Sequence, residues 1–452
     1  MAKERMHRDP DQHPFVERPH RTLVVLSIPI LCSLVAEPVT GLVDNAFIAR
    51  LGATEAAALG AATALFSSCF WMLFFIGVGT HTEVANAFGA ADFDRARRAV
   101  GAALVLAVGL ALGAVAIVWP FLSELATWMG ATGAMHVHTV DYMEIRLIGV
   151  LPQLFMHVCF GAMRGYQQFR LPLWIAIAAN LVNLVLDPLL IFGAGTIPAM
   201  GVAGAAWASS VSQWVGAALA LGVLRKRNSW VLGLHWDVMC RLFAVGRDML
   251  IRTGCLTFFL VASTRLATRV GAEAGAAHLA VRRVWELSAF ILDAYAMTAQ
   301  SLVGYFLGAA RVELARRVAG VGAKWSFGTG CVVTLLMLSG APLAKNLLVP
   351  PEAWSLFGAA WLVSALGQPI NSLSFITDGV HWGTGDYPYL RNATLFATVV
   401  GLGGLWLVNE SADDALVQIW LVTTAWISAR ALSGIVRVWP GIGRRAPLRV
   451  SS

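Results

Sequence analysis

Acidic and amide side chains recur at helical spacing within two long apolar segments of this 452-residue chain. The first segment carries Glu37 and Asp44, and the second carries Asn180, Asn183 and Asp187. Within each segment, spacings of three, four or seven residues place these side chains on one face of a helix. Two carboxylates beside an amide can hold a proton, or a small hard cation through oxygen ligands. The residue types alone do not decide between a proton and a metal cation.

A plainer interpretation of the two aspartates also exists. Asp187 precedes Pro188, so the pair can simply end or kink a helix, and Asp44 can cap one. We favour an ion-binding role because both acids lie a similar distance before the ends of their segments. In parallel helices they would share one depth.

A polar stripe follows one face of the segment 274–307. Arg282, Glu286, Asp293 and Gln300 are separated by steps of four and seven residues. An ionisable group at the centre of a bilayer costs about 2.5 kcal/mol or more, so this stripe cannot face lipid. A similar stripe in 355–382 contains Gln368, Asn371 and Asp378. The two stripes predict a substrate-binding surface, although Arg282 and Glu286 can also form an ion pair that only fixes the helix.

The segments that carry these residues are predicted to be membrane-spanning helices. The chain is 58% hydrophobic and 13% charged, and roughly a quarter of the residues in a soluble domain are charged. Apolar runs long enough to cross about 30 Å of hydrocarbon recur along its whole length. We expect an all-α polytopic membrane protein with twelve spans near 22–49, 57–88, 96–119, 136–163, 171–193, 198–224, 246–268, 274–307, 315–340, 355–382, 389–408 and 414–438.

The loops set the orientation and the domain boundaries. Lys and Arg are concentrated in the loops on the N-terminal side, so the positive-inside rule predicts that both termini are cytoplasmic. The expected parts are a tail (1–21), a six-helix bundle (22–224), a linker (225–245), a second six-helix bundle (246–438) and a tail (439–452). Because the basic residues form no basic domain, we expect no nucleic-acid partner.

The two halves repeat each other. Residues 50–101 align without a gap to residues 269–320, and this places Gly89-Ala90-Ala91 over Gly308-Ala309-Ala310. In a second match, Gly161 and Gly165 fall on Gly379 and Gly383. Each half has six spans, so the repeats share one orientation, which is an architecture of transporters with a site between the halves. Asp293 and Asp378 fall on Phe74 and Phe160, so these acids belong to the second half alone.

Other classes of function fit the sequence less well. A membrane-embedded enzyme needs a catalytic group near one interface and usually a large extramembrane loop, and neither is visible. A receptor that does not transport would not explain why two acidic residues lie at the same depth in the membrane. The cysteines and histidines show no metal-ligand spacing. We therefore expect no enzyme activity and no cofactor.

Several motifs resemble the multidrug and toxic compound extrusion (MATE) transporters. They are IPILCSLVAEPVTGLVDNAFIARLGA (28–53), AFGAADFDRARR (87–98) and RGYQQFRLPLWIAIAANLVNLVLDPLLIFG (164–193). In the second half, FILDAYAMTAQSLVGYFLGAAR (290–311) and FITDGVHWGTGDYPYLRNA (375–393) are similar to the DinF subfamily. The resemblance covers nearly the whole chain in order.

The resemblance implies two pseudo-symmetric six-helix bundles around a V-shaped central cavity. It implies a monomeric antiporter of the inner (cytoplasmic) membrane that exports organic, usually cationic or amphiphilic compounds in exchange for protons or sodium ions. The family's bend proline matches Pro29, and its cation cluster maps onto Asp44, Asn183 and Asp187, which would be metal ligands only with sodium, and onto Ser209. The implied partners are a small-molecule substrate and the lipid bilayer.

The chain also departs from the family pattern. Asn86 and Tyr305 replace a glutamine found in many members, and Arg282 and Arg283 put two charges in a helix that usually offers a neutral polar face to the cavity. We expect these two to be the only arginines well inside a span. They leave two alternatives open, an exporter of an anionic metabolite and a flippase for lipid-linked precursors or amphiphiles.

Overall fold

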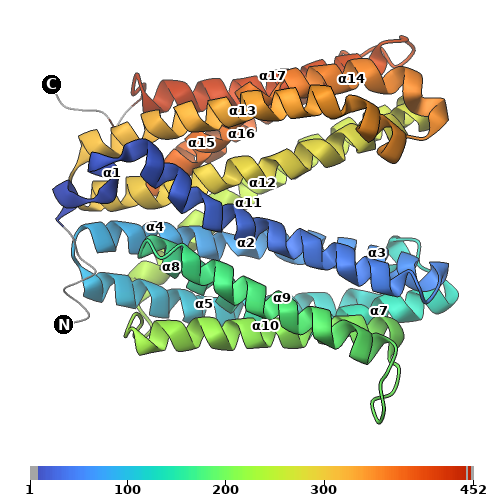
Figure 1. Ribbon diagram of the computed structural model, residues 1–452, viewed down its shortest axis with the longest axis horizontal. Helices are drawn as coiled ribbons and strands as arrows, with labels where there is room; N and C mark the ends of the chain where they lie inside the picture. The colour runs from blue at the N-terminus through green and yellow to red at the C-terminus, as the bar shows by residue number, and fades with distance from the viewer. Residues whose placement is uncertain (1–8, 444–445, 449–452) are drawn as a thin grey trace. The chain divides into compact units, whose positions relative to one another are not determined.

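A computed structural model describes residues 9–443 and 446–448, apart from the side chains of Glu37 and Trp71. Nearly all of this part of the chain is helical, and its extended pairing is one bridge between Ala194 and Ile197. The long helices are α2 (Pro19–Ile48), α3 (Ala53–Phe70), α4 (Phe75–Gly89), α5 (Phe93–Val118), α7 (Gly133–Ile148), α8 (Val150–Gly165), α9 (Arg170–Ile191), α10 (Gly201–Lys226), α11 (Trp236–Val270), α12 (Ala272–Gly308), α13 (Val312–Leu348), α14 (Trp354–Leu366), α15 (Gln368–Thr384), α16 (Tyr387–Trp406) and α17 (Ala415–Val438) (Figure 1).

Short helices complete the described chain. They are η1 (Pro10–Gln12), α1 (Pro14–Glu17), η2 (Trp71–Phe74), η3 (Trp119–Phe121), α6 (Leu122–Trp128) and η4 (Pro351–Ala353). Each of the twelve predicted spans corresponds to one long helix or to two consecutive helices, so the all-α prediction is confirmed. The predicted ends differ most for α11 and α13, which extend to Trp236 and Leu348.

Length and apolar composition alone identify seven spanning helices in the described chain, or nine when each bent pair is one span. The bent pairs are α3 with α4, which meet at 41° around η2, and α7 with α8, which meet at 46°. The second bend has a local cause. Pro152 lacks an N–H, and in a straight helix its ring would clash with the carbonyl of Ile148, the last residue of α7.

The helices form two compact units. Among the described residues, unit 1 comprises those up to 31 and from 247 onward, and unit 2 comprises residues 32–246. Because α2 and α11 each contribute residues to both units, this division differs from the predicted bundles. Residues 22–31 pack with unit 1, and the predicted linker ends inside α11, which begins at Trp236 in unit 2.

The predicted N-terminal tail includes residues that pack into unit 1. Phe15 of α1 is fully buried, and its ring lies 5.9 Å from the ring of Phe306. Asp11 forms an ion pair with Arg311, and Arg317 donates to the carbonyl of Val16 (3.3 Å). These contacts attach the start of the chain to the turn between α12 and α13.

The internal repeat appears in the backbone. Ala91 and Ala310, the last residues of the two Gly-Ala-Ala turns, have left-handed φ angles of 57° and 58°. The amide of Asp92 then donates to the carbonyl of Ala87 (2.9 Å), and the amide of Arg311 donates to that of Phe306 (2.7 Å). Both helices therefore end in the same six-to-one hydrogen bond, the Schellman pattern.

The repeated glycines mark the closest helix crossings in each unit. A Cβ on Gly161 of α8 would lie 2.3 Å from the carbonyl oxygen of Gly77 in α4. A Cβ on Gly379 of α15 would lie 2.2 Å from that of Ala296 in α12. Each glycine is followed four residues later by another, so both units use the small-xxx-small packing that lets membrane helices approach.

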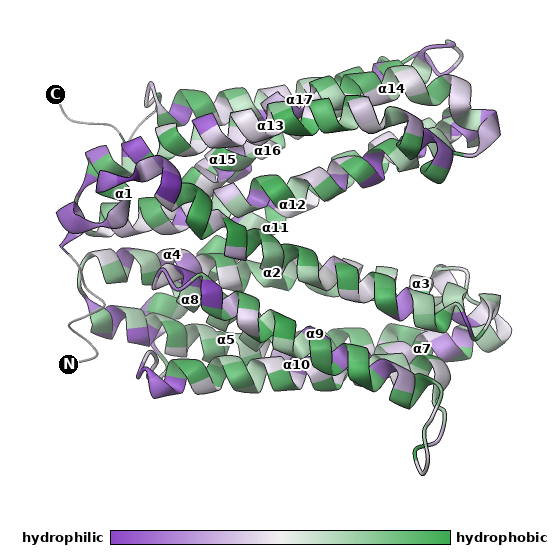
Figure 2. Ribbon diagram, in the orientation of Figure 1, coloured by the Kyte–Doolittle hydropathy of each residue, from purple (hydrophilic) through white to green (hydrophobic). Residues whose placement is uncertain are grey.

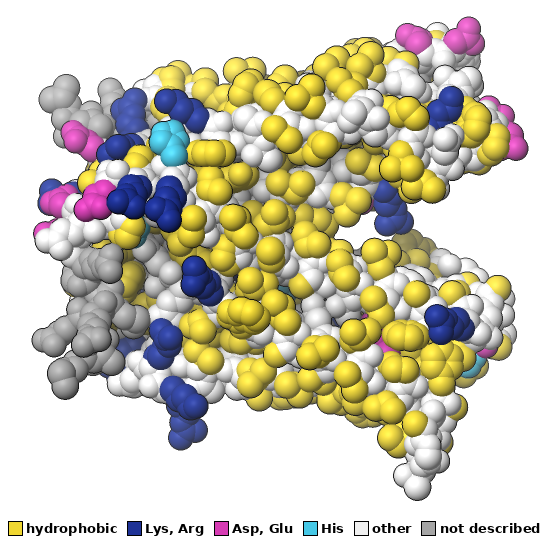
Figure 3. Space-filling view, in the orientation of Figure 1, with side chains coloured by type: hydrophobic (Ala, Val, Ile, Leu, Met, Phe, Trp, Pro, Cys, Tyr) yellow, Lys and Arg dark blue, Asp and Glu magenta, His cyan; other side chains and the backbone are white. Residues whose placement is uncertain are grey.

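Apolar side chains cover the flanks of the helices. Leu112, Ile117 and Trp174 are each more than 60% exposed. Figure 2 shows hydrophobic residues along the middle of the helices and hydrophilic residues toward their ends. In each unit, most of the visible Lys and Arg side chains gather at the left end in Figure 3. An exposed apolar surface of this extent is suited to lipid and not to water.

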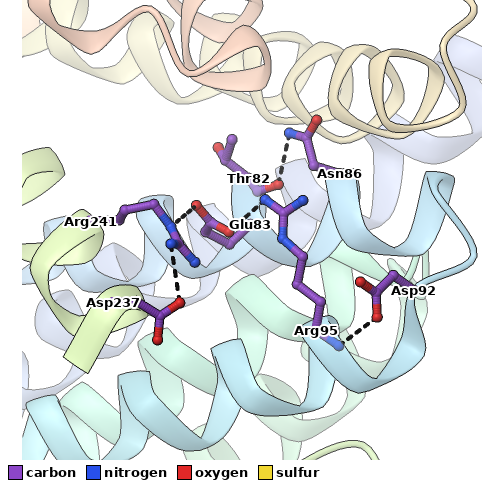
Figure 4. Close-up of polar contacts among 7 residues, drawn as sticks. All are labelled: Thr82, Glu83, Asn86, Asp92, Arg95, Asp237 and Arg241. Atoms are coloured by element: carbon purple, nitrogen blue, oxygen red, sulfur yellow. Dashed lines mark hydrogen bonds and ion pairs between the residues drawn. The ribbon is translucent and has the colours of Figure 1, made fainter. Parts of the chain in front are cut away.

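An ionic network closes that end of unit 2. Glu83 of α4 pairs with Arg95 of α5 (3.1 Å) and with Arg241 of α11 (3.3 Å), which also pairs with Asp237 (Figure 4). The Asp92 side chain caps α5 by accepting from the amide of Arg95 (2.8 Å). The network holds three helices through charges that sequence periodicity does not reveal.

The glycine crossings yield a prediction about stability. Gly379→Ala forces a methyl group against a carbonyl, so we expect it to lower the free energy of unfolding by about 1–3 kcal/mol. The apparent melting temperature of the purified protein, followed by size-exclusion chromatography after heating, measures the loss. The control is Gly328→Ala in α13, because a Cβ there meets nothing within 4 Å. Equal melting temperatures for the two variants would contradict the prediction.

Candidate functional site

The predicted ion-binding residues of unit 2 come together where α2, α9 and α10 meet. Asp44 is 8% exposed, Asn183 is 1% exposed and Asp187 is fully buried. Ser209 of α10 donates to Oδ2 of Asp44 (3.4 Å). α9 and α10 can position these groups because they pack closely. A Cβ on Gly204 of α10 would lie only 2.4 Å from the carbonyl oxygen of Leu190 in α9.

The Asn183 amide can donate to either carboxylate. In one orientation its nitrogen donates to Oδ1 of Asp187 (3.5 Å). In the flipped orientation its nitrogen donates to Oδ1 of Asp44 (3.2 Å), and its oxygen accepts from the amide of Ser209 (3.3 Å). The flipped orientation satisfies both amide atoms, so it is the better assignment.

The two acids also interact, because each carboxyl group acts on the charge of the other. Two carboxyl groups can share a hydrogen bond only when one carries a proton, since an ionised carboxylate is an acceptor alone. A cation between them would remove the same repulsion. With the Asn183 and Ser209 oxygens, the site offers the hard oxygen donors that fit either a proton or a sodium ion.

Asn180, Glu37 and Pro29 were also predicted to belong to this region. Asn180 is half-buried and makes no side-chain hydrogen bond to any described residue. The side chain of Glu37 lies outside the described residues. Pro29 lies within α2, which is one continuous helix from Pro19 to Ile48. The bend predicted at Pro29 therefore stays a prediction.

Sequence reasoning missed two α7 residues beside this site. The positive charge of Arg146 acts on the carboxyl group of Asp44. The charges of Asp44, Asp187 and Arg146 act in turn on the phenol of Tyr142. Both α7 residues are buried. The available signal was a tyrosine and an arginine four residues apart, which lie on one face of a helix.

In unit 1, Arg282 and Glu286 form the ion pair that the sequence left open, with Nε and Oε1 2.8 Å apart. Arg282 also donates to Thr264 Oγ1 (2.8 Å) of α11. Arg283 is exposed. The pairing satisfies Arg282 within its own unit, so its presence does not by itself indicate a negatively charged substrate.

Asp378 lies at the centre of a buried charge cluster. It pairs with Arg252 of α11 and with Arg430 of α17, whose Nη2 lies 2.9 Å from its Oδ2. The two guanidinium groups lie over the rings of Trp382 and Trp426, at 5.4 Å and 5.1 Å from the ring centres. Asp293, which is half-buried, adds its negative charge to the field at Arg430.

This cluster and Arg146 correct a prediction. We expected Arg282 and Arg283 to be the only arginines well inside a span, whereas Arg146, Arg252 and Arg430 are all buried within long helices. The partners of the last two are 126 and 52 residues away along the chain, so no local spacing indicates the pairs.

The remaining stripe residues hold α12 against α15. Gln368 Oε1 accepts from Ser288 (3.0 Å) and from Asn371 Nδ2 (3.4 Å). Gln300 is buried. A Cβ on Gly383 would lie 2.7 Å from the backbone carbonyl oxygen of Gln300. Among the side chains that the structure describes, no three His, Cys, Asp or Glu residues gather as metal ligands.

Known proteins are similar to this chain over most of its length. The family model MatE matches residues 29–189 and 250–407. The "Probable multidrug resistance protein NorM" of Deinococcus radiodurans is 28% identical over 92% of this chain and 94% of its own length. "DNA damage-inducible protein F" of Escherichia coli is 24% identical over 94% and 93%. A structure titled "Crystal structure of MATE in the bent conformation" has the same fold, with a TM-score of 0.87, 20% identity and coverage of 98% and 97%.

The Asp378 cluster predicts a loss of stability when its acid is neutralised. Asp378→Asn leaves two buried guanidinium groups without their shared partner, a change that costs about 3–5 kcal/mol at buried pairs. We expect a low yield and a reduced melting temperature. Adding Arg252→Gln to Asp378→Asn removes one unpaired charge and should recover part of the loss. If Asp378→Asn melts like the unchanged protein, the cluster does not stabilise unit 1.

Proposed function

We propose a function that proceeds from one premise: the chain belongs to the MatE family, whose members are membrane transporters. It is therefore a multi-pass membrane transporter of small molecules and not an enzyme. We propose that it is a secondary active antiporter that exports organic compounds by alternating access, driven by protons or sodium ions. The observation that carries the proposal is the pair of buried acids, Asp44 and Asp187, held by Asn183 and Ser209.

The chemistry of the pair supports coupling. Two carboxylates in contact repel each other, and this repulsion is large in a low-dielectric interior. A proton or sodium ion taken up by the pair removes the repulsion, so the empty and filled sites favour different helix positions. We propose that ion binding moves α2 relative to α9 and α10, because Asp44 is the contribution of α2 to the site.

The same helix, α2, connects the ion site with the rest of the protein, so a movement of α2 can transmit ion binding to unit 1. α2 passes from unit 1 to unit 2 between Leu31 and Cys32, two residues after Pro29. A proline inside a helix removes one backbone hydrogen bond and favours a kink. We propose that α2 bends at Pro29 when the ion site fills, and that this bend accompanies release of the substrate.

We propose that the substrate is an organic cation or amphiphile that contacts the stripe on α12. Glu286 and Asp293 are half-buried, so negatively charged groups are available on this helix. Arg252, Arg282 and Arg430 of unit 1 form ion pairs with acidic residues, so they do not form a binding site for an anionic substrate. This favours a cation over the anionic metabolite and over the lipid-linked precursor, for which we expected an arginine-rich cavity.

We further propose that the protein lies in the inner membrane as a monomer with both termini in the cytoplasm. The gathering of Lys and Arg at one end of the helices supports this orientation by the positive-inside rule (Figure 3).

Replacing Asp44 should abolish coupled export. In proteoliposomes with an imposed pH or sodium gradient, we expect the unchanged protein to move ethidium, a fluorescent cation, and not carboxyfluorescein, a fluorescent anion. Asp44→Asn removes a titratable ligand, so gradient-driven ethidium movement should fall at least tenfold while the protein still folds.

Asp94→Asn is the matched control. It makes the same chemical change at a side chain that is 75% exposed and pairs only with Arg97. Undiminished export by Asp44→Asn would refute the proposed coupling site. Movement of carboxyfluorescein alone would support the anion exporter instead.

A further inference from the structure

Arg146 is a buried cation next to the proposed ion site. It lies near the end of α7 and is 7% exposed. Its Nη1 donates to Oε1 of Gln213 in α10 (2.9 Å), and its guanidinium lies 4.4 Å from the centre of the Phe66 ring in α3. These partners are neutral. Within the described part of the chain, no carboxylate forms an ion pair with Arg146.

A buried guanidinium needs negative charge nearby, because it stays ionised and its desolvation is strongly unfavourable. The charge of Arg146 acts on Asp44 of α2 and on Tyr142 of its own helix. Tyr142 is neutral at physiological pH. Asp44, which also interacts with Asp187, is therefore the source of counter-charge.

The position of Arg146 is fixed by the helix that holds the ion site. Along α10, Ser209 donates to Asp44 (3.4 Å), Ser210 donates to the carbonyl of Ile145 (3.2 Å), and Gln213 accepts from Arg146. Consecutive turns of one helix thus hold both the carboxylate and the arginine. Gly149 follows at the bend, where a Cβ would lie 2.7 Å from Oε1 of Gln213.

We infer that Arg146 is a fixed counter-charge for the Asp44 and Asp187 pair, and that it limits the site to one exchangeable monovalent cation. The two carboxylates contribute two negative charges and the arginine contributes one positive charge. One proton or one sodium ion then neutralises the site, whereas a second cation would leave it positive. Arg146 is a positioning and specificity residue, and this inference rests on the proposed function.

The test titrates the purified protein without any substrate. The infrared absorption of protonated carboxyl groups is recorded against pH, and the Asp44→Asn signal is subtracted from it, in choline chloride and again in sodium chloride. Without the fixed charge of Arg146, the pair holds protons more tightly. We expect the midpoint for Arg146→Gln to rise on the order of one pH unit. Arg146→Lys keeps the charge, so its midpoint should stay with that of the unchanged protein.

The sodium arm tests the charge count. We expect the unchanged protein to lose one protonated carboxyl at most when sodium competes, and Arg146→Gln to bind sodium at lower concentration. An unchanged midpoint and unchanged sodium response in Arg146→Gln would overturn the inference. An equal shift in Arg146→Lys would also overturn it, because shape and not charge would then matter.

A second variant serves as the control for a folding defect. If Arg146→Gln does not fold, the double variant Arg146→Gln/Asp187→Asn restores the net charge of the site and should fold. Failure of both variants would show that Arg146 acts through packing, against the inference. The titration and the export assay test different claims. Export that survives Asp44→Asn refutes the proposed function, whatever result the titration of the Arg146 variants gives.

Discussion

The cost of an uncompensated charge in hydrocarbon governs the interior of both units. An ionised side chain there is stabilised by a partner of opposite sign, and two clusters of unit 1 follow this rule. Arg282 pairs with Glu286, and Asp378 pairs with Arg252 and Arg430. Unit 2 differs, because Arg146 donates to the neutral Gln213 and the two acids, Asp44 and Asp187, interact with each other.

The scaffold around these charges is the same in both units. Glycines at equivalent positions bring α8 against α4 and α15 against α12, and the turn that follows α4 recurs after α12. Backbone packing is thus repeated while the side chains near it diverge. This separation has a physical basis, since close helix crossings need small residues at a few points and leave the other faces of the helices open to change.

The sequence was sufficient for features with a period or a composition. Each of the twelve segments predicted from hydropathy corresponds to one helix or two consecutive helices, and helical spacing placed Asn183 and Asp187 on one face of α9. Features made by distant residues were out of reach. Glu83 contacts Arg241, and Asp378 contacts Arg252, over separations that no window spans. Ser209 was assigned by resemblance alone, because a hydroxyl in an alanine-rich helix has no distinctive pattern. Breaks such as the one after Ile148 were also missed, although Pro152 marked it.

Charge balance explains why we assign ion coupling to unit 2 and not to unit 1. Arginine does not release its proton at any physiological pH, so Asp378 lies against two permanent cations, Arg252 and Arg430. A further cation at Asp378 would add to an excess of buried positive charge, which is unfavourable. Around Asp44 and Asp187 the acids exceed the fixed cation by one. Only a site with such an excess can gain and lose one positive charge without breaking its own ion pairs, and that exchange is what antiport requires.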